Sequence, residues 1–101
     1  MYIINTSFHA GHSIANEIIG KIQSELIPSM IKSELFSDII MAEILIAVDP
    51  NCYSFTLQSK TSDFEQAMEW LQKEGQKFYA ELQKCYGENV VFFTTPMRLL
   101  K

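Results

Sequence analysis

The amino-acid sequence predicts an α+β fold whose strands and helices follow the order β-α-β-β-α-β. Apolar and polar residues alternate, as in half-buried strands, at 2–8, 39–48, 52–58 and 90–95. Apolar residues recur every three or four positions, as in amphipathic helices, at 14–35 and 62–86. This order is typical of the ferredoxin-like architecture, a four-stranded antiparallel sheet with two helices on one face. The architecture hosts many activities and therefore does not by itself predict a function.

Composition predicts one globular domain, residues 1–101, without a nucleic-acid or membrane partner. The chain is 48% hydrophobic, which excludes an intrinsically disordered protein. Its net charge of −4 would repel a phosphate backbone. The sequence starts without a basic segment and contains no run of about 18 apolar residues, so neither a signal peptide nor a membrane span is predicted. The two widely separated cysteines, Cys52 and Cys85, could form a disulfide, but nothing requires one, and they favour a cytoplasmic protein with reduced, mostly buried thiols.

The first strand and the first helix are joined by a predicted turn at residues 9–12. His9 and His12 fall in this segment, where we expect solvated side chains rather than ligands. Two histidines at this spacing could begin a metal site, but no third ligand follows at zinc spacing, so no metal is predicted. Ser13 is the expected N-cap of the first helix.

The first helix has an apolar stripe and one internal proline. Pro28 removes a backbone hydrogen bond, so it should either kink the helix or restart it. The stripe consists of Ile14, Ile18, Ile22, Leu26 and Met30.

A predicted hairpin occupies the middle of the chain. Its first strand, 39–48, is apolar on both faces apart from Glu43, whereas its second strand, 52–58, alternates cleanly. Residues 49–51, Asp-Pro-Asn, have the chemistry of a turn, because proline fixes φ and asparagine tolerates the left-handed conformation.

The second helix is expected to begin with a capping box formed by Ser62 and Glu65. Gly87 is its expected end, and the last strand should end at Pro96, which cannot donate to a ladder. The apolar stripe of this helix consists of Phe64, Ala67, Met68, Leu71, Phe78, Leu82 and Cys85.

Alternation divides the predicted sheet into a face toward the helices and an opposite face. We expect the helix-facing set to be Tyr2, Ile4, Phe8, Ile40, Ala42, Ile44, Ile46, Val48, Tyr53, Phe55 and Leu57. We expect the opposite face to be Ile3, Asn5, Ser7, Met41, Glu43, Leu45, Ala47, Cys52, Ser54, Thr56 and Gln58. Because Met41, Leu45 and Ala47 would be left in water, a second copy of the chain is the expected cover of this face. The alternative is a monomer that tolerates scattered exposed apolar side chains.

Three segments resemble a bacterial domain family of unknown function. They are Tyr-Ile-Ile-Asn-Thr at 2–6, Leu-Ile-Pro at 26–28 with Leu35 and Phe36 after it, and Tyr-Ser-Phe-Thr-Leu-Gln at 53–58. The resemblance covers nearly the whole chain, but its motifs are structural and imply no agreed activity. It implies a dimeric α+β barrel with two facing sheets, similar to antibiotic-biosynthesis and haem-degrading monooxygenases. The predicted partner is therefore a second copy, docked through the sheet face opposite the helices.

A cavity between two such sheets would be lined mainly by polar side chains of the opposite face. Monooxygenases similar in fold use an early-strand asparagine with a helix tryptophan, and Asn5 and Trp70 are the corresponding residues here. They also use a helix histidine, and the segment 62–86 has none, so neither haem nor another cofactor is predicted. The candidate cavity-lining residues are Asn5, Ser7, Glu43, Ser54, Thr56 and Trp70.

Two of these candidates have ordinary structural roles as alternatives. Glu43 on an apolar strand could act as a base, but such a residue more often pairs across an interface, here with Lys60 or Arg98. Trp70 lies one position off the apolar stripe, and a tryptophan in that position more often packs than binds a ligand.

Three functions remain open from the sequence. The first is a homodimer without catalysis that binds a small apolar or amphipathic ligand between the facing sheets. The second is a cofactor-independent or haem-degrading monooxygenase-like enzyme that uses the same cavity. The third is a ligand-sensing regulatory domain of the same topology. RNA binding is excluded, because the third strand offers Ser54 and Thr56 but no stacking ring, and the net charge is unfavourable.

Overall fold

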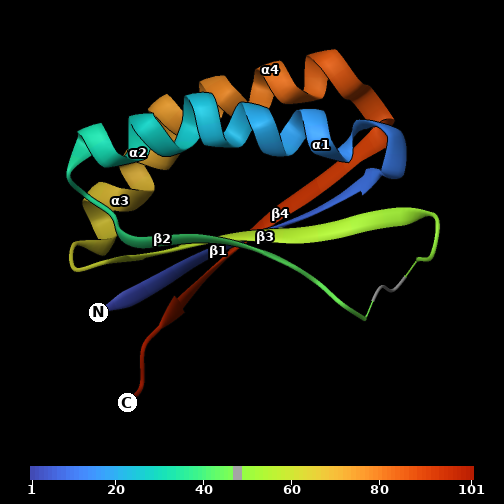
Figure 1. Ribbon diagram of the computed structural model, residues 1–101. Coiled ribbons are helices and arrows are strands. Elements are labelled where there is room, and N and C mark those ends of the chain that lie inside the picture. The colour runs from blue at the N-terminus through green and yellow to red at the C-terminus, as the bar shows by residue number, and fades with distance from the viewer. Residues whose placement is uncertain (47–48) are drawn as a thin grey trace.

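Four antiparallel strands form one sheet, and helices cover one of its faces (Figure 1). The computed structural model describes residues 1–46 and 49–101. The strands are β1 (Tyr2–Gly11), β2 (Ser37–Glu43), β3 (Cys52–Thr61) and β4 (Val90–Arg98). Their order across the sheet is β2-β3-β1-β4, so β1 and β3 are central and β2 and β4 are edges. The predicted order of strands and helices is confirmed.

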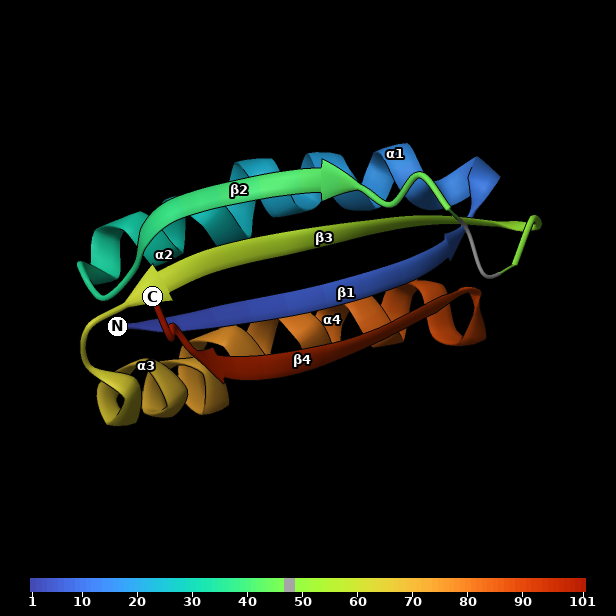
Figure 2. The ribbon, with the colours of Figure 1, turned by 90° about the horizontal axis from the view of Figure 1, so that it is seen from below.

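Two helical runs lie side by side across the sheet. In the view from below, the first run lies behind β2 and β3, and the second lies behind β1 and β4 (Figure 2). The first run consists of α1 (His12–Lys21), a π-helical turn (Ile22–Leu26) and α2 (Ile27–Ser33). The second consists of α3 (Phe64–Trp70), a π-helical turn (Leu71–Gly75), α4 (Gln76–Tyr86) and a short 3₁₀ turn (Gly87–Asn89).

The π-helical turns interrupt both helical runs near their middle. In the first, the amide of Ile27 donates to the carbonyl of Ile22, five residues earlier. Pro28 follows among the first residues of α2, where its missing N–H is tolerated best. The predicted restart at Pro28 is therefore confirmed. The π turns themselves were not predicted, because such turns are rare and occur as single turns inside α-helices.

Helix ends follow the predicted chemistry only in part. Asp63, not Ser62, caps α3, and its carboxylate accepts the amide of Gln66 at 3.1 Å. Ser13 lies inside α1, because β1 continues to Gly11 and leaves that glycine as the N-cap. Both predicted N-caps are therefore wrong. Gly87 ends α4 with a φ of 55°, a conformation that favours glycine, so the predicted end is confirmed.

Three strands are longer than predicted and one is shorter. β1 includes residues 9–11, and β4 continues through Pro96, which an edge strand tolerates. β2 ends at Glu43, so the described residues 44–46 fall outside the strand that the sequence predicted. Ala47 and Val48, assigned above to the same strand, lie outside the described residues.

The predicted turn between β2 and β3 is confirmed. The carboxylate of Asp49 accepts the amide of Asn51 at 2.9 Å, and its carbonyl accepts the amide of Cys52 at 3.1 Å. This arrangement is the local hydrogen bonding that aspartate provides in turns.

The core lies between the sheet and the helices. Phe8 of β1 stacks on Phe55 of β3 with ring centroids 4.9 Å apart, and Tyr79 of α4 lies 6.2 Å from Phe8. Burying an aromatic side chain of this size contributes about 1.5–3 kcal/mol. Ile18 and Leu82 pack into the same core from the two helical runs. The core therefore fixes which face of the sheet the helices cover.

The predicted face assignment is correct for β1 and β3 and wrong for β2. Met41 lies opposite Leu57 and Glu43 lies opposite Phe55, so both share the helix face. Ile40 and Ala42 lie on the other face, the reverse of the prediction. The strand carries apolar residues on both faces, so alternation alone could not decide between them. A register shift between Ser37 and Ile40, with Asp38 at a φ of 48°, sets the observed assignment.

Candidate functional site

The sheet face without helices is the candidate functional site and is called the open face below. Figure 2 shows the sheet from this side. Strand pairing assigns to it one residue in two along each strand. Its side chains are Ile3, Asn5, Ser7, His9, Ser37, Ile40, Ala42, Cys52, Ser54, Thr56, Gln58, Lys60, Val91, Phe93, Thr95 and Met97.

Polar residues occupy the middle of the open face and apolar residues occupy its margins. The polar stripe lies on the central strands and comprises Asn5, Ser7, His9, Ser54, Thr56 and Gln58. The apolar margins lie on the edge strands. Ile40 of β2 is 53% exposed, and Val91 and Phe93 of β4 are 57% and 54% exposed. Exposed apolar side chains gathered on one face are typical of an interaction surface.

Formal charge is nearly absent from the open face. Among the described residues, Lys60 is the charged residue that strand pairing assigns to it, and its Nζ pairs at 3.4 Å with the carboxylate of Asp38 on the edge strand β2. The chain as a whole has a net charge of −4. This face could therefore be buried without desolvating a series of unpaired ions.

His9 lies in β1 rather than in the predicted solvated turn, so that expectation is wrong. Its Nδ1 atom is 2.7 Å from the hydroxyl oxygen of Ser54 on β3, and Ser54 is 3% exposed. The imidazole also stacks on Phe93 of β4, with ring centroids 6.1 Å apart. Contacts from two neighbouring strands therefore hold the ring in place.

Four of the candidate residues named from the sequence lie together on the open face. Asn5 and Ser7 follow each other on β1, and the Asn5 amide donates to the Ser7 hydroxyl at 3.3 Å. Thr56 lies directly opposite Ser7, and Ser54 lies opposite His9. Whether these side chains line a cavity in an assembled protein stays a prediction.

The other two candidates lie away from this group. Glu43 is on the helix face at the end of β2. Trp70 belongs to α3 and packs edge-on against Phe36, with ring centroids 5.3 Å apart. Within the single chain, Lys60 pairs with Asp38 and the Arg98 guanidinium lies 5.9 Å from the ring of Tyr2. Pairing of Glu43 with either residue across an interface stays a prediction.

Glu43 influences Tyr53, its neighbour on the helix face. Burial raises the pKa of the Tyr53 hydroxyl, and the negative charge of Glu43 raises it further. The carboxylate therefore acts on a phenol of the helix face rather than on the polar stripe.

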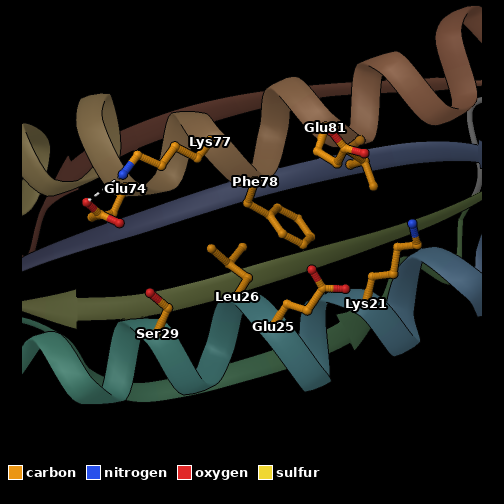
Figure 3. A pocket seen from close by; sticks show the side chains of 9 residues that line it. Lys21, Glu25, Leu26, Ser29, Glu74, Lys77, Phe78 and Glu81 are labelled. Carbon is orange, nitrogen blue, oxygen red and sulfur yellow. Dashed lines mark hydrogen bonds and ion pairs between the residues drawn. The ribbon is translucent and has the colours of Figure 1, made fainter.

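A groove of about 400 Å³ separates the two helical runs on the outer surface (Figure 3). Leu26 and Phe78 point toward each other across it, and Lys77 pairs with Glu74 at 3.2 Å. Its charges have both signs, and its lining contains neither an imidazole nor a thiol. The groove is lined by Lys21, Glu25, Leu26, Ser29, Glu74, Lys77, Phe78, Glu81 and Leu82.

His9 and Phe93 are two open-face residues that the sequence interpretation missed as site candidates. The signal was present in the continued alternation, because His9 follows Ile3, Asn5 and Ser7 at spacings of two. Gly11 suggested an early end of the strand and hid this continuation.

Two further classes of site receive no support within residues 1–46 and 49–101. No group of three or more histidine, cysteine, aspartate or glutamate side chains there could hold a metal ion. No helix in the same part of the chain is long and apolar enough to cross a membrane.

Solved structures place this chain in the ferredoxin-like fold class. A dimeric ferredoxin-like protein from an uncultured marine organism aligns with a TM-score of 0.71 and 13% identity, over 99% of this chain and 96% of that chain. A second protein of the same description aligns with a TM-score of 0.70 and 7% identity, over 100% of this chain and 96% of that chain. A proposed antibiotic biosynthesis monooxygenase from Bacillus cereus aligns with a TM-score of 0.59 and 16% identity, over 99% and 95% of the two chains. At these identities the similarity shows the fold alone.

The sequence itself matches the family described as domain of unknown function DUF4286 over residues 1–100, and the chain belongs to that family. The resemblance to a family of unknown function is thereby confirmed. No curated protein matches the sequence.

Proposed function

We propose that this protein is a homodimer whose two open faces pack against each other, and that the space between them binds a small amphipathic ligand without catalysis. The observation that carries the proposal is the near absence of charge on the open face of a chain with a net charge of −4. Buried interface centres are depleted of charged residues in the same way. The dimeric structures that share this fold support the choice of a second copy as the occupant.

The size of the open face also supports the proposal. Four strands spaced about 4.8 Å apart, with about nine residues rising about 3.3 Å each, cover roughly 600 Å² in projection. Side-chain relief makes the accessible area larger than this projection. Stable interfaces bury about 800 Å² per partner, so one sheet face is of the required order.

The polar stripe is the part of the face that supports a ligand site. Apolar margins on β2 and β4 can seal against a partner, whereas hydroxyl and amide groups lose hydrogen bonds with water when they are buried. Asn5 already bonds to Ser7, and Ser54 to His9. The remaining donors and acceptors of these groups, and the hydroxyl of Thr56, need partners inside the dimer, from the second copy, from ordered water or from a ligand. A ligand with both polar and apolar parts suits a polar stripe between apolar margins.

A monooxygenase-like enzyme is the weaker alternative. Asn5 lies on the open face and Trp70 lies in the helical layer, so one chain does not bring this pair together. We also keep the cytoplasm as the proposed compartment, where the free thiols of Cys52 and Cys85 would stay reduced.

The dimer is tested by light scattering and sedimentation of the full chain at micromolar concentrations. Phe93→Asp should raise the dimer dissociation constant at least about hundredfold, because each dimer would bury two unpaired carboxylates. Ile31→Asp is the matched control, since Ile31 is 61% exposed on α2 in the helical layer. Its dimer dissociation constant should stay unchanged.

Two results would contradict the proposed assembly. One is a wild-type chain that stays monomeric at tens of micromolar. The other is a dimer that Ile31→Asp disrupts and Phe93→Asp leaves intact, which would place the interface on the helical layer.

A further inference from the structure

His9 is held in one orientation by groups that leave one of its ring nitrogens available. The Nδ1 atom is engaged with the hydroxyl of Ser54, which is almost completely buried. Phe93 stacks on the ring from β4 and restricts its rotation. Within the described part of the chain, Nε2 makes no hydrogen bond. A positioned imidazole with one free nitrogen can donate to a ligand oxygen without first losing side-chain entropy.

The residues that flank His9 on the neighbouring strands carry no charge that would repel an acidic group. These residues are Ser54 and Val91. Lys60, the charged residue of this face, lies six residues along β3 from Ser54, which places the two residues about 20 Å apart. The carboxylate of Asp49 lies beyond the end of the stripe, where the Asn51 amide and the Cys52 thiol donate to it.

An apolar wall adjoins the same imidazole. Phe93 and Val91 are both more than half exposed in the single chain. Beside a hydrogen-bonding nitrogen they can cover the apolar body of a ligand, which loses contact with water as the two sheets meet.

We infer that His9 anchors the acidic head of an amphipathic weak acid, such as a monocarboxylate with an apolar body, in the space between the two sheets. Nε2 donates to the head group, Ser54 positions the ring, and Phe93 packs against the apolar body. The inference rests on the proposed function, because the ligand is enclosed only when a second open face covers it.

Titration calorimetry with three probes of equal chain length tests this inference. Octanoate, octanol and octylamine share an apolar body and differ in their heads. The wild-type chain should bind octanoate at least about tenfold more tightly than either other probe. His9→Gln should abolish this preference, and Ser54→Ala should reduce it to a smaller extent by freeing the ring. His12→Gln should keep it, because His12 lies at the start of α1 and contacts the carbonyl of Pro50.

Light scattering on the same samples separates the two levels of the proposal. A His9→Gln dimer that still prefers octanoate would overturn the role of His9 while the proposed assembly survives. A wild-type dimer that binds all three probes equally would also overturn the role of His9 and leave the proposed assembly intact. A wild-type monomer would overturn both. A dimeric His9→Gln chain that loses only the octanoate preference would support the assignment.

Discussion

The two sides of this sheet differ in charge and in how far their apolar side chains are covered. On the helix side, a dense core is covered by helices whose outer surface carries more than half of the charged residues of the chain. On the open face, apolar side chains stay exposed, and Lys60 is the charged residue among the described side chains. A surface adapted to water is charged on its outside, whereas a surface adapted to a protein partner is not. The difference supports the proposal that the open face is the functional side.

The largest predicted effect is a loss of stability. It is tested by comparing Phe8 and Phe93, which lie on opposite faces of the neighbouring strands β1 and β4. Phe8 is fully buried in the core, so Phe8→Ala should lower the free energy of unfolding by about 3–5 kcal/mol. Phe93→Ala should lower it by less than about 1 kcal/mol when the protein is dilute enough to be monomeric. Urea denaturation followed by circular dichroism measures both. Equal losses in the two variants would mean that the open face is not a free surface of the monomer.

A smaller effect tests the start of the helical layer. Asp63→Ala removes the side chain that accepts the Gln66 amide, so it should lower the free energy of unfolding by about 1 kcal/mol. Ser62→Ala is the matched control and should change it by less than about 0.5 kcal/mol. Chemical denaturation of the pair decides between the cap in the structure and the cap that the sequence suggested. A larger loss in the serine variant would favour the latter.

The smallest predicted effect is a change in the pKa of Tyr53 when Glu43, at the end of β2, loses its charge. Because the charge of Glu43 adds to burial in raising the pKa of Tyr53, Glu43→Gln should shift that pKa downward. Because the pKa of Tyr53 is raised in the folded state, its contribution to stability falls as the pH rises. The contribution of Tyr53 is present below about pH 10, the ordinary tyrosine pKa, and is lost as the pH rises through the folded-state pKa. NMR titration of the Tyr53 ring measures the shift.

Glu65→Gln, a change of equal charge on α3, is the control for this titration. An unchanged pKa of Tyr53 in the Glu43 variant would indicate that β2 presents Glu43 to the open face after all.

Local periodicity carried most of the fold prediction. The alternation of β1 and β3 correctly assigned Phe8 and Phe55 to the core and Asn5 and Ser54 to the opposite face, because both strands have one clearly apolar side. The order of strands and helices along the chain followed from the same pattern. Helix caps and strand ends were less accurate, since a shift of one residue, as from Ser62 to Asp63, changes little in the pattern.

The candidate site was predictable only where one strand defined it. Asn5 and Ser7 share a strand, so their common face followed from spacing. The pairing of His9 with Ser54 joins residues 45 positions apart, and no local pattern contains it. Trp70 entered the candidate group from a resemblance, and its place in the helical layer depends on packing against Phe36.

The sequence by itself determined the order of the elements, the apolar stripes of the helices and the low charge of the central strands, because these are properties of neighbouring residues. Tertiary structure alone decided which face of β2 meets the helices, since both faces are apolar and a register shift beside Asp38 selects one. It also decided that His9 stands among polar groups of the open face. Pairing between distant strands supplies that information, and it depends on register rather than on composition.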